Sequence, residues 1–548
     1  MIGVLSREHQ KAAVEEFFEL FKTPWERCQE DKTYDVVITT IPGASVPPTK
    51  LVIVFGSEAS SFDSRNGVKI ISRDKKIDID WEGAKIPIYG ESATFKGQSK
   101  PFLPSNRGNT AGLVIHCPDS RILRIGYDLF DEIDHLLRCG QPAGKARVPT
   151  LELHIAMLRQ WILGSGIPLI EIPPSPYGYD FTTCLTHDID FMGIRDHKLD
   201  HTMLGFSYRS LIPKYLKGLD RKTSLARYLK NLKALLSLPL VYMGILPDFW
   251  FPLERYREME KGLKSTFFFI PFKDRPGMPL GGEPAKFRAA RYDIDRFKES
   301  IRSLTRQGCE VGLHGIDAWQ DAAKGRKELE VIRGITEKQK IGIRMHWLYS
   351  TDETPKKLEE AGVYYDSTLG YNEDIGFRSG TTQVFRLPGT SSVFELPLHV
   401  QDTAMLLTGR MGVSEPQAIT MCGRLIEEIR TYGGVITINW HDRSLAPERN
   451  WDGIYRALLD MLRAEKTWFA TAGEVVAWFE KRRATRFEPA ESADGVPKIR
   501  MPETESGKGP PLTLRVYRPE GLPHEETEIL KIFKDYPLNA DKEFGGGY

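Results

Sequence analysis

The sequence predicts an α/β protein whose larger domain is a parallel sheet or barrel with helices on the outside. From residue 265 to residue 475, short apolar strand patterns alternate with patterns of helical periodicity, as in chains of strand–helix–strand units. Four predicted strands end in a His or a His–Asp group, and strand ends are where α/β folds place their sites. At 548 residues the chain is too long for one ordinary core, so two or three domains are expected.

The composition excludes some classes of function. The net charge is +1, which gives no electrostatic case for a nucleic-acid partner. The six cysteines are scattered without a Cys-x-x-Cys pair, which argues against a zinc knuckle or a disulfide framework and suits a reducing compartment. The first nine residues lack a basic region followed by an apolar one, and no apolar run is long enough to span a bilayer. We therefore expect a cytoplasmic protein.

Residues 1–145 are predicted to form a smaller mixed α/β domain of unknown role. Apolar spacing predicts a helix over 10–30, and clusters of Pro, Gly and Ser separate the short strand patterns that follow. Residues 146–180 are predicted to be a linking helix and a proline-rich connector, because each proline fixes φ and disfavours helix before it. Strands are expected near 35–39, 51–55, 68–72, 86–89, 112–116 and 122–126, with helices at 128–137 and 150–163.

The larger domain is predicted to span 181–486. Capping-box patterns at Ser414–Gln417 and Thr471–Glu474 predict two helix starts. Beyond 486 the composition shifts toward Pro, Gly, Glu and Lys, so 487–548 is predicted to be an appendage or partly ordered tail with one strand. The other strands are expected at 181–185, 265–270, 310–313, 342–345, 363–365, 394–398, 435–440 and 512–517, and helices at 295–307, 327–338 and 455–464.

A basic segment, 209–233, follows the first of the strands that end in polar groups. It carries eight Lys and Arg residues against a single acid, Asp220, with leucines at roughly helical spacing. A basic amphipathic helix can lie on an anionic membrane or bind an acidic ligand. An ordinary helix with a solvated face is the alternative, and the sequence leaves both interpretations open.

The polar strand ends form the candidate site. They are Thr186–Asp190, Gly312–His314, Arg344–His346 and Asn439–His441. A single His could be a core residue, and the two aspartates of the first segment could simply cap a turn. If the strands are parallel, however, all four ends gather at one mouth of the sheet, and this favours a site.

Asp and His side chains at one place suit a borderline divalent ion such as Zn, Co, Ni or Mn. Three protein ligands with one open position are a catalytic arrangement. Such an ion acidifies water and polarises a carbonyl, while a remaining carboxylate can act as base and a remaining His as acid. These residues together could catalyse the hydrolysis of an amide or ester.

These motifs resemble those of the polysaccharide deacetylases with the NodB-homology domain, over roughly 165–485. The most similar branch has Thr-His-Asp-x-Asp, Gly-Leu-His-Gly and Arg-x-His motifs and a Tyr-Asp-Ser-Thr-Leu-Gly segment, which here is Tyr365–Gly370. The resemblance implies an irregular (β/α) barrel of the NodB-homology type. It also implies a divalent metal and the removal of acetyl groups from N-acetylated sugars.

Carried over residue by residue, the resemblance implies five roles. Asp188 matches the catalytic base, and Arg344 would orient and ionise it. Asp190 matches the metal carboxylate and His314 the first metal His. His441 matches the acid that protonates the departing amine.

The sequence departs from the common pattern at two places. The first motif usually has adjacent aspartates, whereas Ile189 separates them here, and a second metal His is usual where this chain has Ala318. The metal would then lack a ligand. His346 is the first choice for that ligand and Asp317 the second.

Other residues are candidates around these. Trp347 is expected to line the substrate pocket or to supply a backbone N–H to the oxyanion, and Trp440 is assigned with it to substrate binding. Asp366 and Arg386 are expected to hold the site residues in place through hydrogen bonds, and they are also assigned to substrate binding. Asp402 is a weaker candidate, for which the role of a turn residue is favoured.

The sequence therefore predicts a metal-dependent deacetylase of an N-acetylated sugar or glycan. Zinc is the first choice of metal, with Co, Ni or Mn as alternatives. A cytoplasmic location points to an intermediate of surface-glycan assembly. Two alternatives stay open: hydrolysis of another non-peptide C–N bond, as in a cyclic amide, and a glycan-binding protein that has lost catalysis.

Overall fold

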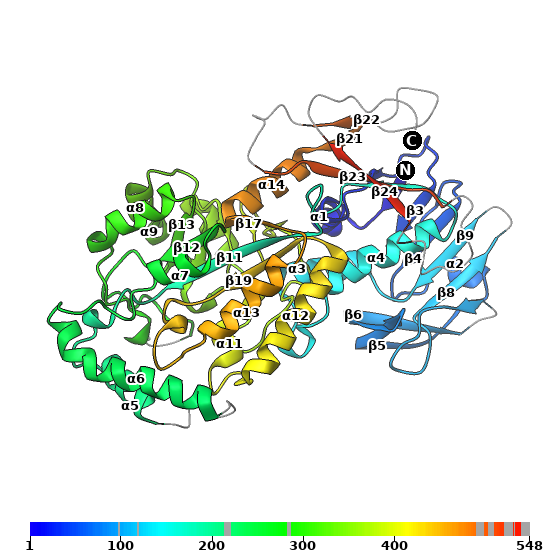
Figure 1. Ribbon diagram of the computed structural model, residues 1–548. Coiled ribbons are helices and arrows are strands. Elements are labelled where there is room, and N and C mark those ends of the chain that lie inside the picture. Colours follow the sequence, from blue (N-terminus) through cyan, green and yellow to red (C-terminus); the bar gives the residue numbers. More distant parts are fainter. Residues whose placement is uncertain are drawn as a thin grey trace. The chain divides into compact units, whose positions relative to one another are not determined.

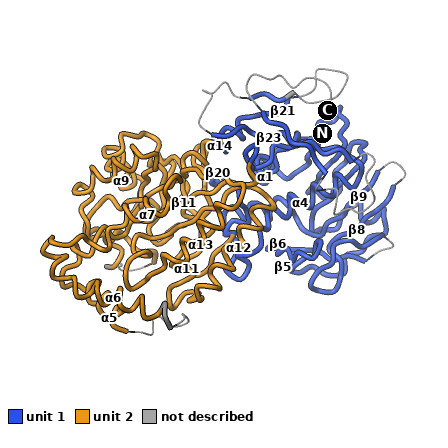
Figure 2. Tube along the Cα trace, viewed as in Figure 1, with its two compact units in different colours: residues 1–178, 377–388, 478–548 blue, residues 179–376, 389–477 orange. Residues whose placement is uncertain are grey.

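The computed structural model describes residues 1–96, 99–117, 120–212, 221–281, 286–488, 498–501, 509–519, 530 and 532–538. Figure 1 shows the chain as a ribbon. It divides into two compact units (Figure 2). Unit 1 comprises Met1–Gly178, Phe377–Pro388 and Trp478–Tyr548, and unit 2 comprises Tyr179–Gly376 and Gly389–Ala477. Within the described part of the chain, every helix is too short or too polar to cross a bilayer.

Unit 2 is an α/β unit built on a curled, parallel sheet (Figure 1). All of its printed pairings are parallel, in the order β17-β15-β14-β13-β12-β11-β19-β18, with β20 also paired to β11. The predicted parallel sheet is therefore confirmed. The strands are β11 (Phe181–Ile189), β12 (Ser265–Phe269), β13 (Glu310–Gly315), β14 (Ile343–Met345), β15 (Tyr365–Asp366), β17 (Phe394–Glu395), β18 (Val400–Gln401), β19 (Val435–Asn439) and β20 (Thr467–Phe469).

The strand at the centre of the candidate site, β11, is buried along its whole length. Its sequence, Phe-Thr-Thr-Cys-Leu-Thr-His-Asp-Ile, has β-branched residues, which suit a strand covered on both faces. It continues four residues beyond the predicted end at Leu185, as far as Ile189. Similarly, β13 reaches Gly315, so His314 lies inside the strand rather than after it. The polar groups are thus held by regular strand geometry.

Helices connect most of these strands. The helix predicted to begin at residue 327 is α9, and it begins five residues earlier, at Ala322. The Asp321 carboxylate caps this start by accepting hydrogen bonds from the N–H groups of Ala323 and Lys324. The capping box at Ser414 is confirmed. The helices are α5 (His201–Leu211), α6 (Arg221–Tyr242), α7 (Leu253–Met259), α8 (Lys298–Arg306), α9 (Ala322–Thr336), α10 (Thr354–Ala361), α11 (Asp402–Leu406), α12 (Glu415–Tyr432), α13 (Asp452–Arg463) and α14 (Ala472–Ala484), which contains the unit boundary.

Unit 1 contains a second, mixed sheet in the order β2-β1-β3-β4-β9-β8-β7. A long hairpin, β5–β6, and a three-stranded sheet, β10-β23-β24, complete it with the pair β21-β22. Its elements are β1 (Ile2–Leu5), α1 (Lys11–Phe21), β2 (Trp25–Arg27), β3 (Val36–Thr39), β4 (Leu51–Phe55), α2 (Ser61–Arg65), β5 (Lys69–Trp81), β6 (Ala84–Lys96), β7 (Lys100–Pro101), β8 (Gly112–His116), β9 (Arg121–Ile125), α3 (Leu129–Arg138), α4 (Thr150–Leu163), β10 (Leu169–Glu171), β16 (Phe385–Arg386), β21 (Arg486–Glu488), β22 (Lys498–Arg500), β23 (Leu512–Tyr517) and β24 (Phe533–Leu538).

The predicted helix over 10–30 is wrong in its second half. The helix α1 ends at Phe21, Lys22 takes a left-handed conformation with φ of 49°, and β2 follows. Pro24 explains the stop, because a proline disfavours helix in the residue before it. The connector 170–176 is also partly strand, since β10 pairs with β23. The strand predicted at 512–517 is confirmed.

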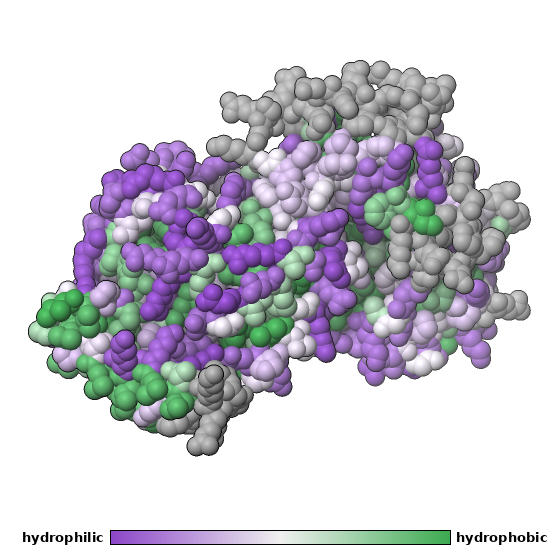
Figure 3. All heavy atoms as spheres, viewed as in Figure 1, coloured by the Kyte–Doolittle hydropathy of each residue, from purple (hydrophilic) through white to green (hydrophobic). Residues whose placement is uncertain are grey.

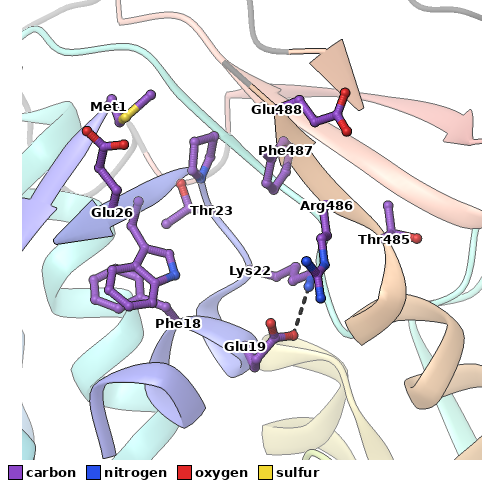
Figure 4. A pocket seen from close by; sticks show the side chains of 12 residues that line it. Met1, Phe18, Glu19, Lys22, Thr23, Glu26, Thr485, Arg486, Phe487 and Glu488 are labelled. Carbon is purple, nitrogen blue, oxygen red and sulfur yellow. Dashed lines mark hydrogen bonds and ion pairs between the residues drawn. The ribbon is translucent and has the colours of Figure 1, made fainter. Parts of the chain in front are cut away.

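A hollow of about 320 Å³ lies in unit 1 between α1, β2 and β21 (Figure 4). Trp25 stacks on Phe18 at its wall, with ring centroids 4.5 Å apart. Lys22 Nζ donates a hydrogen bond to Glu19, and burial lowers the pKa of Lys22 to about 8. The hollow's described residues are not part of the group of His, Cys, Asp and Glu side chains that could hold a metal ion, which lies in unit 2.

Candidate metal centre and active site

The alternation of β11 decides where the residues of the first motif point. Successive side chains of a strand face opposite sides. His187 lies against Tyr256, with ring centroids 3.9 Å apart, whereas Asp188 contacts residues of other strand ends. The intervening Ile189 therefore places Asp188 and Asp190 on the same side. The common motif has two adjacent aspartates. In this chain the two-residue spacing brings both carboxylates to one side of the strand.

Three side chains converge as a candidate metal centre. The Nε2 atoms of His314 and His346 each lie 3.3 Å from Asp190 Oδ1, and all three ligand atoms lie within 4.8 Å of one another. Among the described residues this is the one group of three or more His, Cys, Asp or Glu side chains with such a geometry. The group comes from the ends of β11, β13 and β14, as parallel strands predict.

The hydrogen bonds of this group fit a cation. His314 Nδ1 lies 2.9 Å from the carbonyl oxygen of Arg344. A carbonyl only accepts, so Nδ1 carries the proton and Nε2 offers its lone pair. The buried Asp190 Oδ1 accepts no hydrogen bond of normal geometry within the described structure, although both rings face it.

The pKa values also suit a cation site. Burial lowers the pKa of His346 to about 3, so this ring is neutral. Burial alone would raise the pKa of Asp190, but His346 and His314 lower it, so this group is a carboxylate. The charges of Asp188 and Asp190 outweigh burial and raise the pKa of His314. A metal ion therefore competes with a proton for the His314 imidazole. One carboxylate and two imidazoles are a zinc-type ligand set with room for a further ligand.

Asp188 stands beside this group but is held by different partners. Arg344 Nη1 donates to its Oδ1 at 3.1 Å, and Asn439 Nδ2 donates to its Oδ2 at 2.7 Å. The buried guanidinium is itself fixed by Thr186 and Ser367. Burial would raise the pKa of Asp188, but the charges of Arg344, His314 and His441 together outweigh it and hold the pKa below its usual value. Asp188 is thus an ionised, oriented carboxylate 3.9 Å from His314 Nε2.

His441 is paired with Asp402. Its Nδ1 donates to Asp402 Oδ1 at 2.5 Å, and its backbone N–H donates to Oδ2 at 2.7 Å. The hydroxyl of Ser444 donates to the same carboxylate. Burial would lower the pKa of His441, but Asp402 raises it to about 9, with help from Asp190 and Asp188. His441 therefore holds a proton at neutral pH. Asp402 does more than shape a turn, because it orients and charges this imidazole.

Trp347 lies at the exposed rim of the group. Its side chain is 38% exposed, and its ring meets that of His346 edge to face at 5.7 Å. Its φ is 65° and that of Leu348 is 56°, a strained conformation for large side chains that recurs at functional sites. This placement suits the expected role in lining a substrate pocket.

The structure favours His346 over Asp317 as the third ligand. Asp317 accepts hydrogen bonds from the Met278 N–H and from Lys324, and it is not part of the converging group. Position 318, where the common motif has a His, is a buried alanine. The candidate for the third ligand, His346, thus follows β14, whereas position 318 follows β13.

The other candidates are not members of the converging group of three. Asp366 is buried on β15, bound by the Thr368 hydroxyl, and burial raises its pKa to about 7. Trp440 is fully buried and stacks on Tyr455, with centroids 5.0 Å apart, a position of core packing. Arg386 belongs to unit 1, where its N–H donates to Glu16. A substrate contact by these three stays a prediction.

Two polar residues around Asp188 escaped the sequence analysis as site residues. Asn439 accepts from the Asp188 N–H and donates to its carboxylate, and Gln401 accepts from Asn439 at 3.4 Å. The sequence does indicate Asn439 as a candidate, because it stands two residues before His441 at a predicted strand end. Gln401 had none, because it reaches the site only through the register of β18 with β19.

Replacing Asp402 by Asn is expected to shift the alkaline limb of the activity profile toward lower pH. The protonated form of His441 exists below its pKa and is lost as pH rises through about 9. Without the anionic partner this pKa falls, so the acid form is lost earlier. The measurement is the pH dependence of hydrolysis for the wild type, Asp402→Asn and the control Ser444→Ala, which keeps the carboxylate. An unmoved alkaline limb in Asp402→Asn would contradict the pairing as its cause.

Comparisons with known proteins come from solved structures. No family model and no curated protein matches the sequence. A putative polysaccharide deacetylase from Mycobacterium smegmatis is similar, at 20% identity and a TM-score of 0.34, over 57% of this chain and 95% of that one. A probable polysaccharide deacetylase from Pseudomonas aeruginosa PAO1 matches at 15% identity and a TM-score of 0.35, over 56% and 95%.

Another similar structure is Puue allantoinase, at 13% identity and a TM-score of 0.33, over 56% of this chain and 92% of that one. At these TM-scores the matches are likenesses only, and the case for a function must be made by the site residues. With that limit, the predicted resemblance is confirmed: polysaccharide deacetylases are among the solved structures to which this chain is similar.

Proposed function

We propose that this protein is a metal-dependent hydrolase that removes the acetyl group from an N-acetylated sugar or glycan. The observation that carries the proposal is the convergence of Asp190, His314 and His346 on one point beside two further groups with opposite protonation. Asp188 is held ionised and His441 is held protonated. Two titratable groups whose environments drive their pKa values apart are the usual mark of a base and an acid.

In this proposal the two groups divide the proton transfers. Asp188 takes the proton of the attacking water, because Arg344 and Asn439 orient its carboxylate. His441 gives its proton to the departing amine, which would otherwise be a poor leaving group. The cation held by Asp190, His314 and His346 supplies polarisation of the amide carbonyl and acidification of water when bound. Zinc is the proposed metal, since it accepts this ligand set in four-coordinate catalytic sites.

The proposed substrate class rests on an aromatic side chain beside the proposed metal site. Trp347 offers an exposed aromatic surface next to the proposed metal site, and aromatic rings provide large apolar faces for packing. A sugar ring can lie on such a face. We propose in addition that unit 2 is an irregular (β/α) barrel of the NodB-homology type, and that the protein works in the cytoplasm on an intermediate of surface-glycan assembly.

The test combines metal content with product release. The full chain is purified and its zinc, cobalt, nickel and manganese are measured, and acetate release is followed on a panel of N-acetylated sugars with chelated protein as control. We expect one divalent ion per chain and acetate release that chelation abolishes and the metal restores. Hydrolysis of cyclic amides without acetate release would instead support the alternative C–N hydrolase. Glycan binding by a metal-free, inactive protein would overturn both enzyme proposals.

A further inference from the structure

The helix α6 presents apolar side chains on the face turned away from the protein. Leu225, Leu229, Leu236 and Leu240 recur at helical spacing and are 57%, 54%, 72% and 40% exposed. Met243, directly after the helix, is 63% exposed. The opposite face is a normal buried one, since Ala234, Leu238 and Val241 belong to an internal apolar cluster. The outer leucines are therefore not needed for the packing of the helix.

The neighbouring helix α5 repeats the arrangement. Its outward residues Leu204, Tyr208 and Leu211 have the spacing i, i+4 and i+7, and each is about half exposed or more. Its inward residue Phe206 packs in the same cluster as α6. Figure 3 shows the apolar surface gathered over these two helices. Ile245 and Leu246, 65% and 37% exposed, extend it beyond the end of α6. We call this surface, from Leu204 to Leu246, the α5–α6 face.

Basic residues accompany the α5–α6 face. Lys233 borders the apolar stripe of α6 and is exposed. Lys230, three residues earlier, is also exposed, and its Nζ lies 3.9 Å from Asp452. Arg209 on α5 is not counted with them, because its guanidinium lies 3.7 Å from the buried carboxylate of Glu448. The sequence over 209–233 has eight Lys and Arg residues and one acid. Of these eight, Lys214, Lys217 and the side chains of Arg221 and Lys222 lie outside the described part of the chain, and Arg227 forms an ion pair with Glu415. The long stems of Lys and Arg can lie along apolar surface while their charges stay in water.

We propose that the α5–α6 face docks the protein onto the surface of an anionic phospholipid bilayer. Apolar side chains and cations combined on helices that lie side by side match the two layers of a membrane surface, the acyl chains and the anionic headgroups. A soluble acidic ligand would use the cations but leave the leucines exposed to water. Exposed apolar surface of this extent is otherwise unfavourable in a monomer. This inference is independent of the proposed hydrolase.

The proposal is tested by sedimentation of the full chain with vesicles. We expect binding to vesicles of phosphatidylglycerol and phosphatidylcholine, weakened by salt, and much less binding to phosphatidylcholine alone. The double variant Leu236→Asp with Met243→Asp is expected to lower the partition coefficient by at least about tenfold, because two inserted side chains become charged. Lys233→Glu is expected to lower it by at least about fivefold on the anionic vesicles only.

The matched control is Ile71→Asp, which changes an apolar side chain that is 48% exposed on β5 of unit 1. It is expected to bind vesicles like the wild type. Unchanged thermal unfolding midpoints show that the variants remain folded. The proposal is overturned if the wild type ignores both kinds of vesicle, or if the double variant binds as well as the wild type. It is also overturned if the face instead joins two copies, seen as a dimer that the double variant dissociates without any vesicle binding.

Discussion

Substituting Asp188 by Asn is expected to lower kcat/KM for acetate release by about 100- to 10,000-fold, the usual contribution of a positioned base. Asparagine keeps the shape of the side chain but cannot take up a proton. Arg344 and Asn439 each donate to one carboxylate oxygen, so the asparagine oxygen keeps one of these hydrogen bonds and its NH2 group loses the other. The zinc content should stay at one ion per chain, because Asp188 is not one of the three converging ligands.

The measurement is steady-state hydrolysis together with metal analysis of the same preparation. Asp317→Asn is the matched control, since this carboxylate is engaged with Lys324 and the Met278 N–H, and its activity should be within a few-fold of the wild type. If Asp188→Asn released acetate at the wild-type rate, Asp188 would not be the base. If it lost the metal together with activity, Asp188 would be a ligand.

Substituting His346 by Gln is expected to abolish stoichiometric metal binding. Changes to residues that only support metal ligands cost about 10- to 100-fold in affinity, so removal of a ligand should cost more than about 100-fold. Asp190 and His314 alone would leave a two-ligand site. Activity should fall with the metal, and it should return in part when excess zinc is added.

The affinities of the wild type, His346→Gln and Asp317→Asn are compared by titration with zinc in the presence of a competing chelator. We expect Asp317→Asn to bind like the wild type. The reverse result, with metal lost in Asp317→Asn and kept in His346→Gln, would mean that the second choice of the sequence analysis is the true ligand. Binding unaffected in both variants would place the cation elsewhere.

The parallel sheet of unit 2 could be predicted because its signals are local. Strand patterns ending in His or Asp recur with helical patterns between them, and the carboxyl ends of parallel strands meet at one edge. His314 and Arg344 are indeed register partners on adjacent strands. The convergence of His314 and His346 followed from this rule. The end of α1 at Phe21 was missed although Pro24 was visible, because the apolar spacing was given more weight.

Other parts of the site have no local signal. The sequence around Asp402 indicates an ordinary turn residue. Only the fold brings it to His441, which is 39 residues away in the sequence. Trp440 was expected to contact substrate because it adjoins His441, but its side chain stacks in the core on Tyr455. The direction of a side chain at a strand end depends on where the strand stops, and boundaries of this kind are poorly set by local pattern.

The sequence by itself determined which chemical groups stand at the strand ends and that Asp188 and Asp190 are two residues apart. Only the tertiary structure decided which of the two is suited to each task. Asp188 meets Arg344, 156 residues away, whereas Asp190 meets two imidazoles, which suits the proposed role of a metal ligand. The physical reason is that the protonation and coordination of a buried carboxylate depend on the charges and lone pairs around it, and here those belong to distant strands.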